Sequence, residues 1–168
     1  MPLLEPLYNF AHWLTQSREE AEDLVQETYA KGLKGFGTFQ PGSNFRAWMF
    51  RILRNSFLTS RSGLKSMVPL EDAEEAQLLP SALETPETLA LGREDEELVR
   101  AALEQLPVAY REVVLLCDWE QMSYSDIAGL LGIPIGTVMS RISRARRAMR
   151  QFLMAAYRLP DAKKKSDK

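Results

Sequence analysis

Apolar residues recur at intervals of three and four along most of this chain, and this spacing constrains its fold more than any other feature. The clearest stripe lies near the C-terminus, where the apolar positions are Val138, Ile142, Ala145, Met149 and Phe152. Such spacing places side chains on one face of an α-helix. The alternation of apolar and polar residues that is typical of β-strands is nearly absent. The sequence therefore predicts an all-α fold.

Two capping signals help to set the helix boundaries. Ser17 is followed three residues later by Glu20, and Ser123 is followed by Asp126, as in a capping box. Glycine and proline interrupt the pattern over 36–43, which predicts a loop. The expected helices cover about 3–15, 17–35, 44–60, 96–106, 107–117, 124–131 and 135–157.

Charge is distributed in blocks, although the net charge is only −2. Residues 31–62 hold six basic and no acidic side chains, and residues 137–168 hold ten basic and two acidic ones. Between them, residues 63–98 hold ten acidic and two basic side chains. Two cationic blocks indicate two contacts with a polyanion, joined by a solvated connector. We therefore expect two small helical domains over 1–62 and 96–158, a flexible acidic linker over 63–95, and a basic, disordered tail over 159–168.

Several function classes are disfavoured by composition. One cysteine, Cys117, excludes an internal disulfide framework and a CxxC metal site, and one histidine, His12, argues against a Ser-His-Asp triad. No run of 18 apolar residues predicts a membrane span, and the N-terminus lacks the pattern of a signal peptide. We expect a cytoplasmic protein that is not an enzyme, has no catalytic residues, binds no metal or cofactor, and does not insert into a membrane.

The segment over 123–148 has the pattern of a helix-turn-helix: a capped short helix, a turn at 132–134 and a longer helix. Serine and arginine side chains on the second helix are suited to the edges of bases and to phosphates in the major groove. On a helical wheel the positions that face away from the apolar stripe, or flank that face, are Thr137, Met139, Ser140, Ser143, Arg144, Arg146 and Arg147.

A second basic segment mixes arginines with aromatic residues. Arg46, Arg51 and Arg54 alternate with Phe45, Trp48, Phe50 and Phe57, after a loop that holds Phe36 and Phe39. Some of these rings are needed to fill a small core. Rings interleaved with cations also suit unpaired bases, which stack while arginines hold the backbone. The pattern alone leaves both interpretations open.

Three stretches carry a resemblance to a known family: AEDLVQETY at 21–29, FQPGSNFRAWMFRILRN at 39–55, and LPVAYREVVLLCDWEQMSYSDIAGLLGIPIGTVMSRISRARRAMR at 106–150. Together they resemble regions 2 and 4 of an extracytoplasmic-function (group IV) sigma factor of bacterial RNA polymerase. The resemblance runs from about residue 7 to residue 153. The GTVMSR sequence is similar to the branch controlled by zinc-binding, redox-sensitive anti-sigma factors.

The resemblance implies a role for each surface. Core polymerase would dock its β′ clamp helices on Asp23, Gln26 and Glu27, and its β flap is a further expected contact. An anti-sigma factor is an expected partner, and the acidic linker would enter the channels of the polymerase. The melted −10 promoter element would bind Phe39, Gln40, Ser43, Asn44, Arg46, Trp48, Arg51 and Asn55. The −35 element would bind the helix positions named above, together with Arg141.

Two other functions stay open from the sequence. A helix-turn-helix regulator would bind duplex DNA without polymerase and would leave the 21–29 motif without a role. A sigma-like decoy would sequester a partner and support no transcription.

Overall fold

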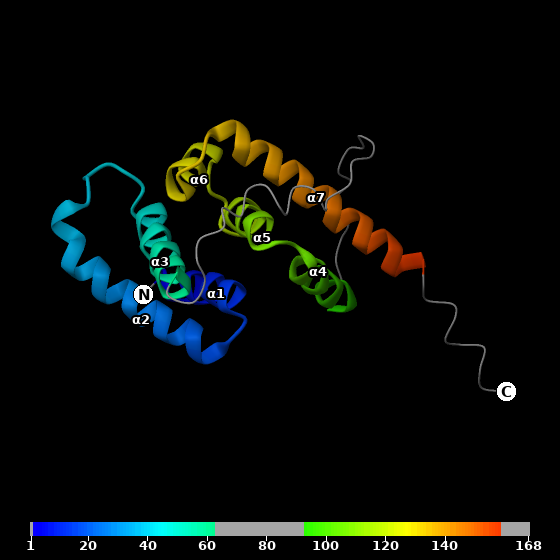
Figure 1. The fold of residues 1–168 in the computed structure, drawn as a ribbon, viewed down its shortest axis with the longest axis horizontal. Helices are drawn as coiled ribbons and strands as arrows, with labels where there is room; N and C mark the ends of the chain where they lie inside the picture. The colour runs from blue at the N-terminus through cyan, green and yellow to red at the C-terminus, as the bar shows by residue number, and fades with distance from the viewer. Residues whose placement is uncertain (1, 63–92, 159–168) are drawn as a thin grey trace. The chain divides into compact units, whose positions relative to one another are not determined.

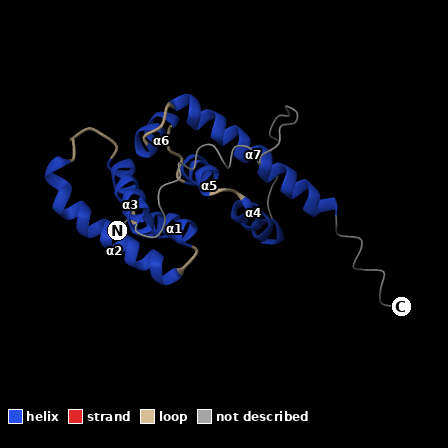
Figure 2. Cartoon of the chain, in the orientation of Figure 1, coloured by secondary structure: helices blue, strands red, loops and turns tan. Residues whose placement is uncertain are grey.

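The computed structural model describes residues 2–62 and 93–158, and within these residues every helix or strand assigned is a helix (Figure 2). The all-α prediction is confirmed. The described residues form two compact units, one of 2–62 with 115–139 and one of 93–114 with 140–158. The predicted linker and tail lie outside the described residues, except that the helix expected from 96 already begins at residue 93. None of the described helices has the length and apolarity needed to span a membrane.

Three helices build the core of the first unit: α1 (Leu4–Thr15), α2 (Arg18–Gly35) and α3 (Phe45–Ser62), each in contact with the other two (Figure 1). The rings of Phe10 and Phe50 lie 5.3 Å apart, and both side chains are almost fully buried. Leu7, Leu24 and Leu53 fill the space around them. Burying a side chain of this kind stabilises the fold by roughly 1.5–3 kcal/mol. This core fixes the outward faces of α2 and α3.

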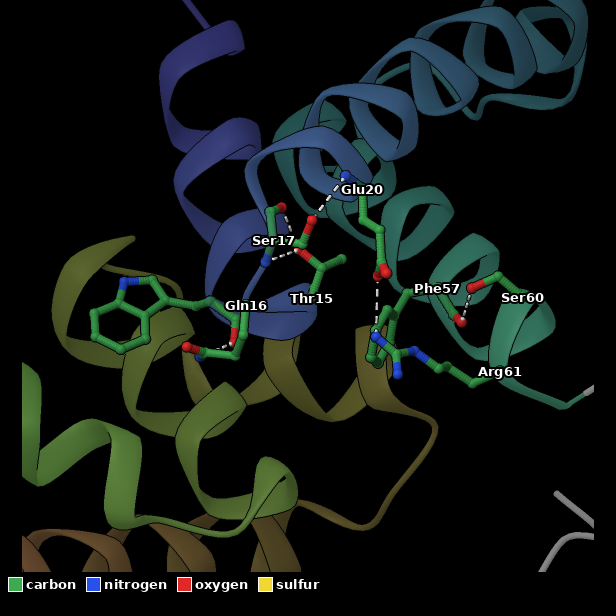
Figure 3. A network of polar contacts seen from close by, with 8 residues as sticks. Thr15, Gln16, Ser17, Glu20, Phe57, Ser60 and Arg61 are labelled. Atoms are coloured by element: carbon green, nitrogen blue, oxygen red, sulfur yellow. Dashed lines mark hydrogen bonds and ion pairs between the residues drawn. The ribbon is translucent and has the colours of Figure 1, made fainter. Parts of the chain in front are cut away.

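The start of α2 confirms one half of the predicted capping box and replaces the other (Figure 3). Ser17 Oγ accepts from the Glu20 N–H at 3.3 Å, as expected. The Ser17 N–H, however, donates to Thr15 Oγ1 at 3.3 Å. The Glu20 carboxylate instead accepts from Arg61 of α3 at 3.1 Å, while Arg61 lies over the ring of Phe57. The acidic residue of the capping box, Glu20, therefore links α2 to α3 instead of capping the N-terminus of α2.

The rest of the first unit comprises a short 3₁₀ turn, η1 (Phe36–Thr38), a π-helical turn, η3 (Leu115–Trp119), and the helix α6 (Tyr124–Leu131), followed by the start of α7 (Ile135–Arg158). Ser123 Oγ accepts from the Asp126 N–H at 3.0 Å, which confirms the second cap. Gly132 ends α6 with φ of 67°, and its N–H donates to the Ala128 carbonyl oxygen. This left-handed conformation favours glycine because it has no Cβ. Within this unit, α6 lies against α3.

The second unit contains α4 (Arg93–Gln105), α5 (Val108–Val114) and most of α7. The α-helix expected to reach about residue 117 ends at Val114, and the chain continues as the π turn. Arg111 of α5 is buried, and its guanidinium donates to the carbonyl oxygens of Leu103, Glu104 and Leu106 at 2.9–3.0 Å. Burial lowers the pKa of Arg111. The apolar stripe of α7 turns inward as predicted: Val138, Ile142 and Ala145 are buried, and Met149 and Phe152 are half-buried.

Candidate nucleic-acid and partner interfaces

An aromatic cluster outside the core joins η1 to the start of α3. Its members are Phe36, Phe39, Phe45 and Trp48, and neighbouring ring centroids lie 5.3–6.5 Å apart. Phe36 is 59% exposed and Phe45 is 40% exposed. Water-exposed aromatic faces provide the flat, apolar surfaces on which unpaired bases stack. The structure thus distinguishes core rings from surface rings, which the sequence pattern could not do. Phe50 and Phe57 belong to the core, and the four rings of the aromatic cluster do not.

Phe36 and Phe45 were not among the residues predicted for this site. Both occur in the sequence segment that mixes aromatics with arginines, but the pattern did not separate them from core residues. Phe45 and Trp48 are three residues apart on α3, so they share a face. Phe36 directly follows Gly35, the last residue of α2. These two local signals indicate a shared surface once the helix boundaries are known.

A tight polar turn precedes α3. The Ser43 N–H and hydroxyl both donate to the Gln40 carbonyl oxygen, at 3.1 and 2.6 Å. Gly42 has φ of 88° in this turn, a value that favours glycine. Asn44 then caps α3 by accepting the Ala47 N–H on Oδ1 at 3.1 Å. The turn holds the exposed side chains of Gln40, Ser43 and Asn44 next to the aromatic cluster.

The remaining predicted −10 residues lie along α3. Arg51 and Asn55 are exposed, and with Asn44 and Trp48 they recur at helical spacing on one face. Arg46 lies elsewhere: it is half-buried and forms an ion pair with Glu120. The Arg46 guanidinium also lies 5.8 Å from the ring centre of Phe50, and its Nε has no hydrogen-bond partner.

A hollow of about 480 Å³ lies between this face and α6. Gln40, Asn44, Trp48 and Arg51 line one side, and residues of α6, among them Asp126, line the other. Asn44 Nδ2 donates to Asp126 Oδ2 across it at 2.9 Å. No local pattern in the sequence indicates Glu120 or Asp126 as neighbours of this face, because they lie 74 and 82 residues away from the side chains they contact.

The predicted polymerase-docking residues lie on the outer face of α2. Asp23, Gln26 and Glu27 are exposed, as the helical wheel indicated, and Glu27 pairs with Lys31 at 2.6 Å. Beside them, residues of α1 and α2 together line an apolar hollow of about 550 Å³, and Gln26 forms part of its wall. Sequence reasoning missed this hollow, which is lined by Leu4, Glu5, Tyr8, Glu22, Val25 and Gln26.

The predicted −35 residues lie on α7. Met139, Ser143, Arg144 and Arg146 are exposed, and the half-buried ones are Thr137, Ser140, Arg141 and Arg147. Met139, 52% exposed, brings an apolar side chain to a face otherwise made of threonine, serine and arginine. The exposed cations can reach phosphates and base edges, which is the chemistry that duplex recognition needs.

Two family models match the chain in the order expected. The model for sigma-70 region 2 matches residues 2–65, and the model for sigma-70 region 4 matches residues 96–149. Together they cover more than half of the chain.

Curated relatives agree with this assignment. The chain is 40% identical over 144 residues to the ECF RNA polymerase sigma factor EcfG of Rhodopseudomonas palustris, covering 86% of this chain and 77% of that protein. It is 36% identical over 149 residues to the ECF RNA polymerase sigma factor SigE of Mycolicibacterium smegmatis, covering 88% of this chain and 57% of that longer protein.

Solved structures give the same fold. The sigma factor RpoE of Bartonella quintana, determined with the anti-sigma factor NepR, aligns with a TM-score of 0.67 at 32% identity, over 91% of this chain and 92% of that chain. CnrH, determined with the cytosolic domain of CnrY, aligns with a TM-score of 0.64 at 25% identity, over 92% of this chain and 84% of that chain. The expected link to zinc-binding anti-sigma factors stays a prediction. The two region models in order, and relatives that match most of the chain, place it among the extracytoplasmic-function sigma factors of the sigma-70 family.

Proposed function

We propose that this chain directs core RNA polymerase to promoters and helps to open them. The observation that carries the proposal is the exposed aromatic cluster beside the polar turn at Gln40–Asn44. Stacking of an unpaired base on an aromatic ring contributes roughly 1–3 kcal/mol. That gain offsets the few kcal/mol needed to take a base out of the duplex. Melting is then a consequence of binding, and the chain needs no catalytic residue or cofactor of its own.

The strand would be held by residues of three kinds. Phe39 and Trp48 supply ring faces, to which the structure adds Phe36 and Phe45. Gln40, Ser43, Asn44 and Asn55 supply hydrogen-bonding groups for base edges and sugars. Arg46 and Arg51 supply positive charge for the phosphates.

The second promoter contact belongs to α7. Its exposed serine and arginine side chains suit the major groove of a −35 element, and phosphate contacts there make the affinity fall steeply with salt. We assign this contact to Thr137, Met139, Ser140, Arg141, Ser143, Arg144, Arg146 and Arg147.

Core polymerase is the proposed protein partner. The acidic and amide side chains of Asp23, Gln26 and Glu27 form the contact for its β′ clamp helices, and the domain over 96–158 meets its β flap. An anti-sigma factor is a proposed regulator, as in the complexes of RpoE with NepR and of CnrH with CnrY. We assign the chain to the cytoplasm, because core polymerase is its proposed partner. We also propose that the two promoter contacts belong to separate domains over 1–62 and 96–158.

The proposal is tested by selecting fragments of genomic DNA with the chain and core polymerase together, and with the chain alone. With polymerase, the enriched fragments should share two motifs at a fixed spacing, upstream of a common start site. Enrichment of one duplex motif by the chain alone, unchanged when polymerase is added, would favour a simple helix-turn-helix regulator. Binding to polymerase without enrichment of any motif would favour a decoy.

A further inference from the structure

Two exposed apolar side chains lie at the N-terminal end of α7, the helix proposed for the −35 element. Ile135 is 50% exposed and Met139 is 52% exposed. They are four residues apart on one helix, so their side chains are neighbours. We refer to Ile135 and Met139 as the apolar pair. Every other residue assigned to the −35 contact is threonine, serine or arginine.

The core does not require the apolar pair. Val138, Ile142 and Ala145 are 0–2% exposed and form the buried side of α7. Consecutive residues are about 100° apart around a helix, so Met139 is turned away from Val138 and from this buried side. About half of the surface of each side chain in the apolar pair is therefore available to a ligand.

The start of α7 places the apolar pair where a recognition helix meets bases. The Val138 N–H donates to the Pro134 carbonyl oxygen at 3.2 Å, and the helix begins at Ile135. Gly136 brings no side chain to this first turn, and a Cβ there would meet no atom within 4 Å. The backbone can therefore approach a groove closely. In helix-turn-helix proteins the N-terminal residues of the second helix contact base edges.

The chemistry of the apolar pair is suited to one kind of base. Neither side chain can donate a hydrogen bond, and the thioether sulfur of methionine is only a weak acceptor. In the major groove, the apolar group at a base edge is the C5-methyl group of thymine. Contact between this methyl group and the apolar pair removes both from water, which is favourable. The apolar pair therefore favours thymine over bases that present only polar groups.

The neighbouring side chains make this face suitable for DNA. Ser143 is exposed one helical turn after Met139, and Arg144 and Arg146 are exposed just beyond it. The cations attract phosphates whatever the base sequence is, and a serine hydroxyl can bond to several bases. These residues can hold the helix on DNA, and the apolar pair adds a preference among bases.

From these observations, and resting on the proposed function, we propose that Met139, with Ile135 beside it, selects a thymine of the −35 element through the C5-methyl group. Burial of one methyl group corresponds to a factor of about four in affinity. The contact requires an apolar side chain at position 139 and no charge.

The test begins with selection of a random duplex library by the chain and core polymerase together, which gives the −35 motif. Each thymine of that motif, on either strand, is then replaced by uracil, which differs only in lacking the methyl group. The affinity of the complex of chain and core polymerase for each fluorescein-labelled duplex is measured by anisotropy. One replacement should weaken binding about fourfold, and the others less than twofold.

Variants of the chain assign this effect to a residue. Met139→Gln keeps the length of the side chain and makes it polar, so binding should no longer distinguish thymine from uracil at that base pair. Met139→Leu keeps an apolar side chain and should retain at least twofold discrimination. The matched control is Met154→Gln, at an exposed methionine further along α7, which should leave the fourfold discrimination unchanged.

Equal binding of every uracil duplex would overturn the proposal, and so would a fourfold preference for thymine that persists in Met139→Gln. A selected −35 motif without thymine would overturn it as well. In these three cases a motif has been selected, so the proposed promoter recognition stands while this inference fails. Selection of no motif would overturn both. The uracil measurement uses the unaltered chain, so it can overturn the proposal even if Met139→Gln does not fold.

Discussion

Replacing Arg111 with methionine should destabilise the second unit by a predictable amount. The guanidinium donates three hydrogen bonds to backbone carbonyl oxygens at the corner between α4 and α5, two of them buried and one partly buried. Methionine keeps most of the apolar length of the side chain and leaves all three carbonyl oxygens without this donor.

The magnitude follows from these three bonds. A buried acceptor left without a partner costs roughly 1–3 kcal/mol. The Leu103 carbonyl oxygen keeps the Leu106 N–H at 3.1 Å, and the partly buried Glu104 carbonyl oxygen can recover a bond to water, so the buried Leu106 carbonyl oxygen accounts for most of the loss. Against this loss, the substitution also removes a charge whose burial is unfavourable, as the lowered pKa of Arg111 indicates. We expect a net loss of about 1–3 kcal/mol, a large fraction of the 5–15 kcal/mol that is typical of a domain.

Urea unfolding of the full chain, followed by circular dichroism, gives the change in stability, and hydrogen exchange at the amides of 103–111 reports on this corner directly. The matched control is Arg100→Met, an exposed arginine on the neighbouring helix α4, which should lose about 0.5 kcal/mol or less. A loss at Arg111 no larger than the loss at Arg100 would refute the reasoning, because the three bonds would then contribute nothing beyond solvation.

Three further predictions concern the proposed interfaces. Asp23→Lys combined with Glu27→Lys should weaken binding to core polymerase at least tenfold and leave the affinity for −35 duplex unchanged, as measured by anisotropy; unchanged core affinity would refute the docking assignment. Trp48→Ala should impair promoter opening, followed by permanganate reactivity, more than formation of the closed complex, since stacking contributes roughly 1–3 kcal/mol only once bases are unpaired; equal losses in both would indicate a packing role. Arg144→Ala should cost about 1–3 kcal/mol at one −35 base pair and relax specificity there; a uniform loss over all sequences would make Arg144 a phosphate contact.

Local signals in the sequence were sufficient to predict where most of the helices lie and which face of α7 is buried. Ser17 and Ser123 cap the helices that the sequence predicted for them, and the apolar stripe on α7 is turned inward. These features depend on residues three or four positions apart. Helical geometry brings such residues together whatever the rest of the chain does.

Long-range partners could not be predicted in this way. Glu20 and Asp126 each occupy the acidic position of a capping box, yet their carboxylates contact Arg61 and Asn44, which lie 41 and 82 residues away along the chain. The same holds for Arg111, a buried cation in the helix expected over 107–117, where nothing in the spacing indicated its burial. No periodicity encodes such contacts, because they depend on how helices pack.

The aromatic residues show both what local spacing can predict and what depends on long-range packing. Spacing alone did not decide which aromatic rings between residues 36 and 57 belong to the core and which lie on the surface. Packing against α1 buries Phe50, whereas Phe36 and Phe45 stay exposed beside the polar turn. The candidate −10 face was thus predictable as a segment but not residue by residue.

The central claim is tested most directly by transcription in vitro from fragmented genomic DNA, using core polymerase from the same organism with and without this chain. The account predicts new transcripts with defined start sites that depend on the chain, and alignment of the upstream sequences should give both promoter elements. Binding to core polymerase without any new transcript would contradict the account and favour a decoy. Failure to bind core polymerase at all would leave only a DNA-binding helix-turn-helix protein.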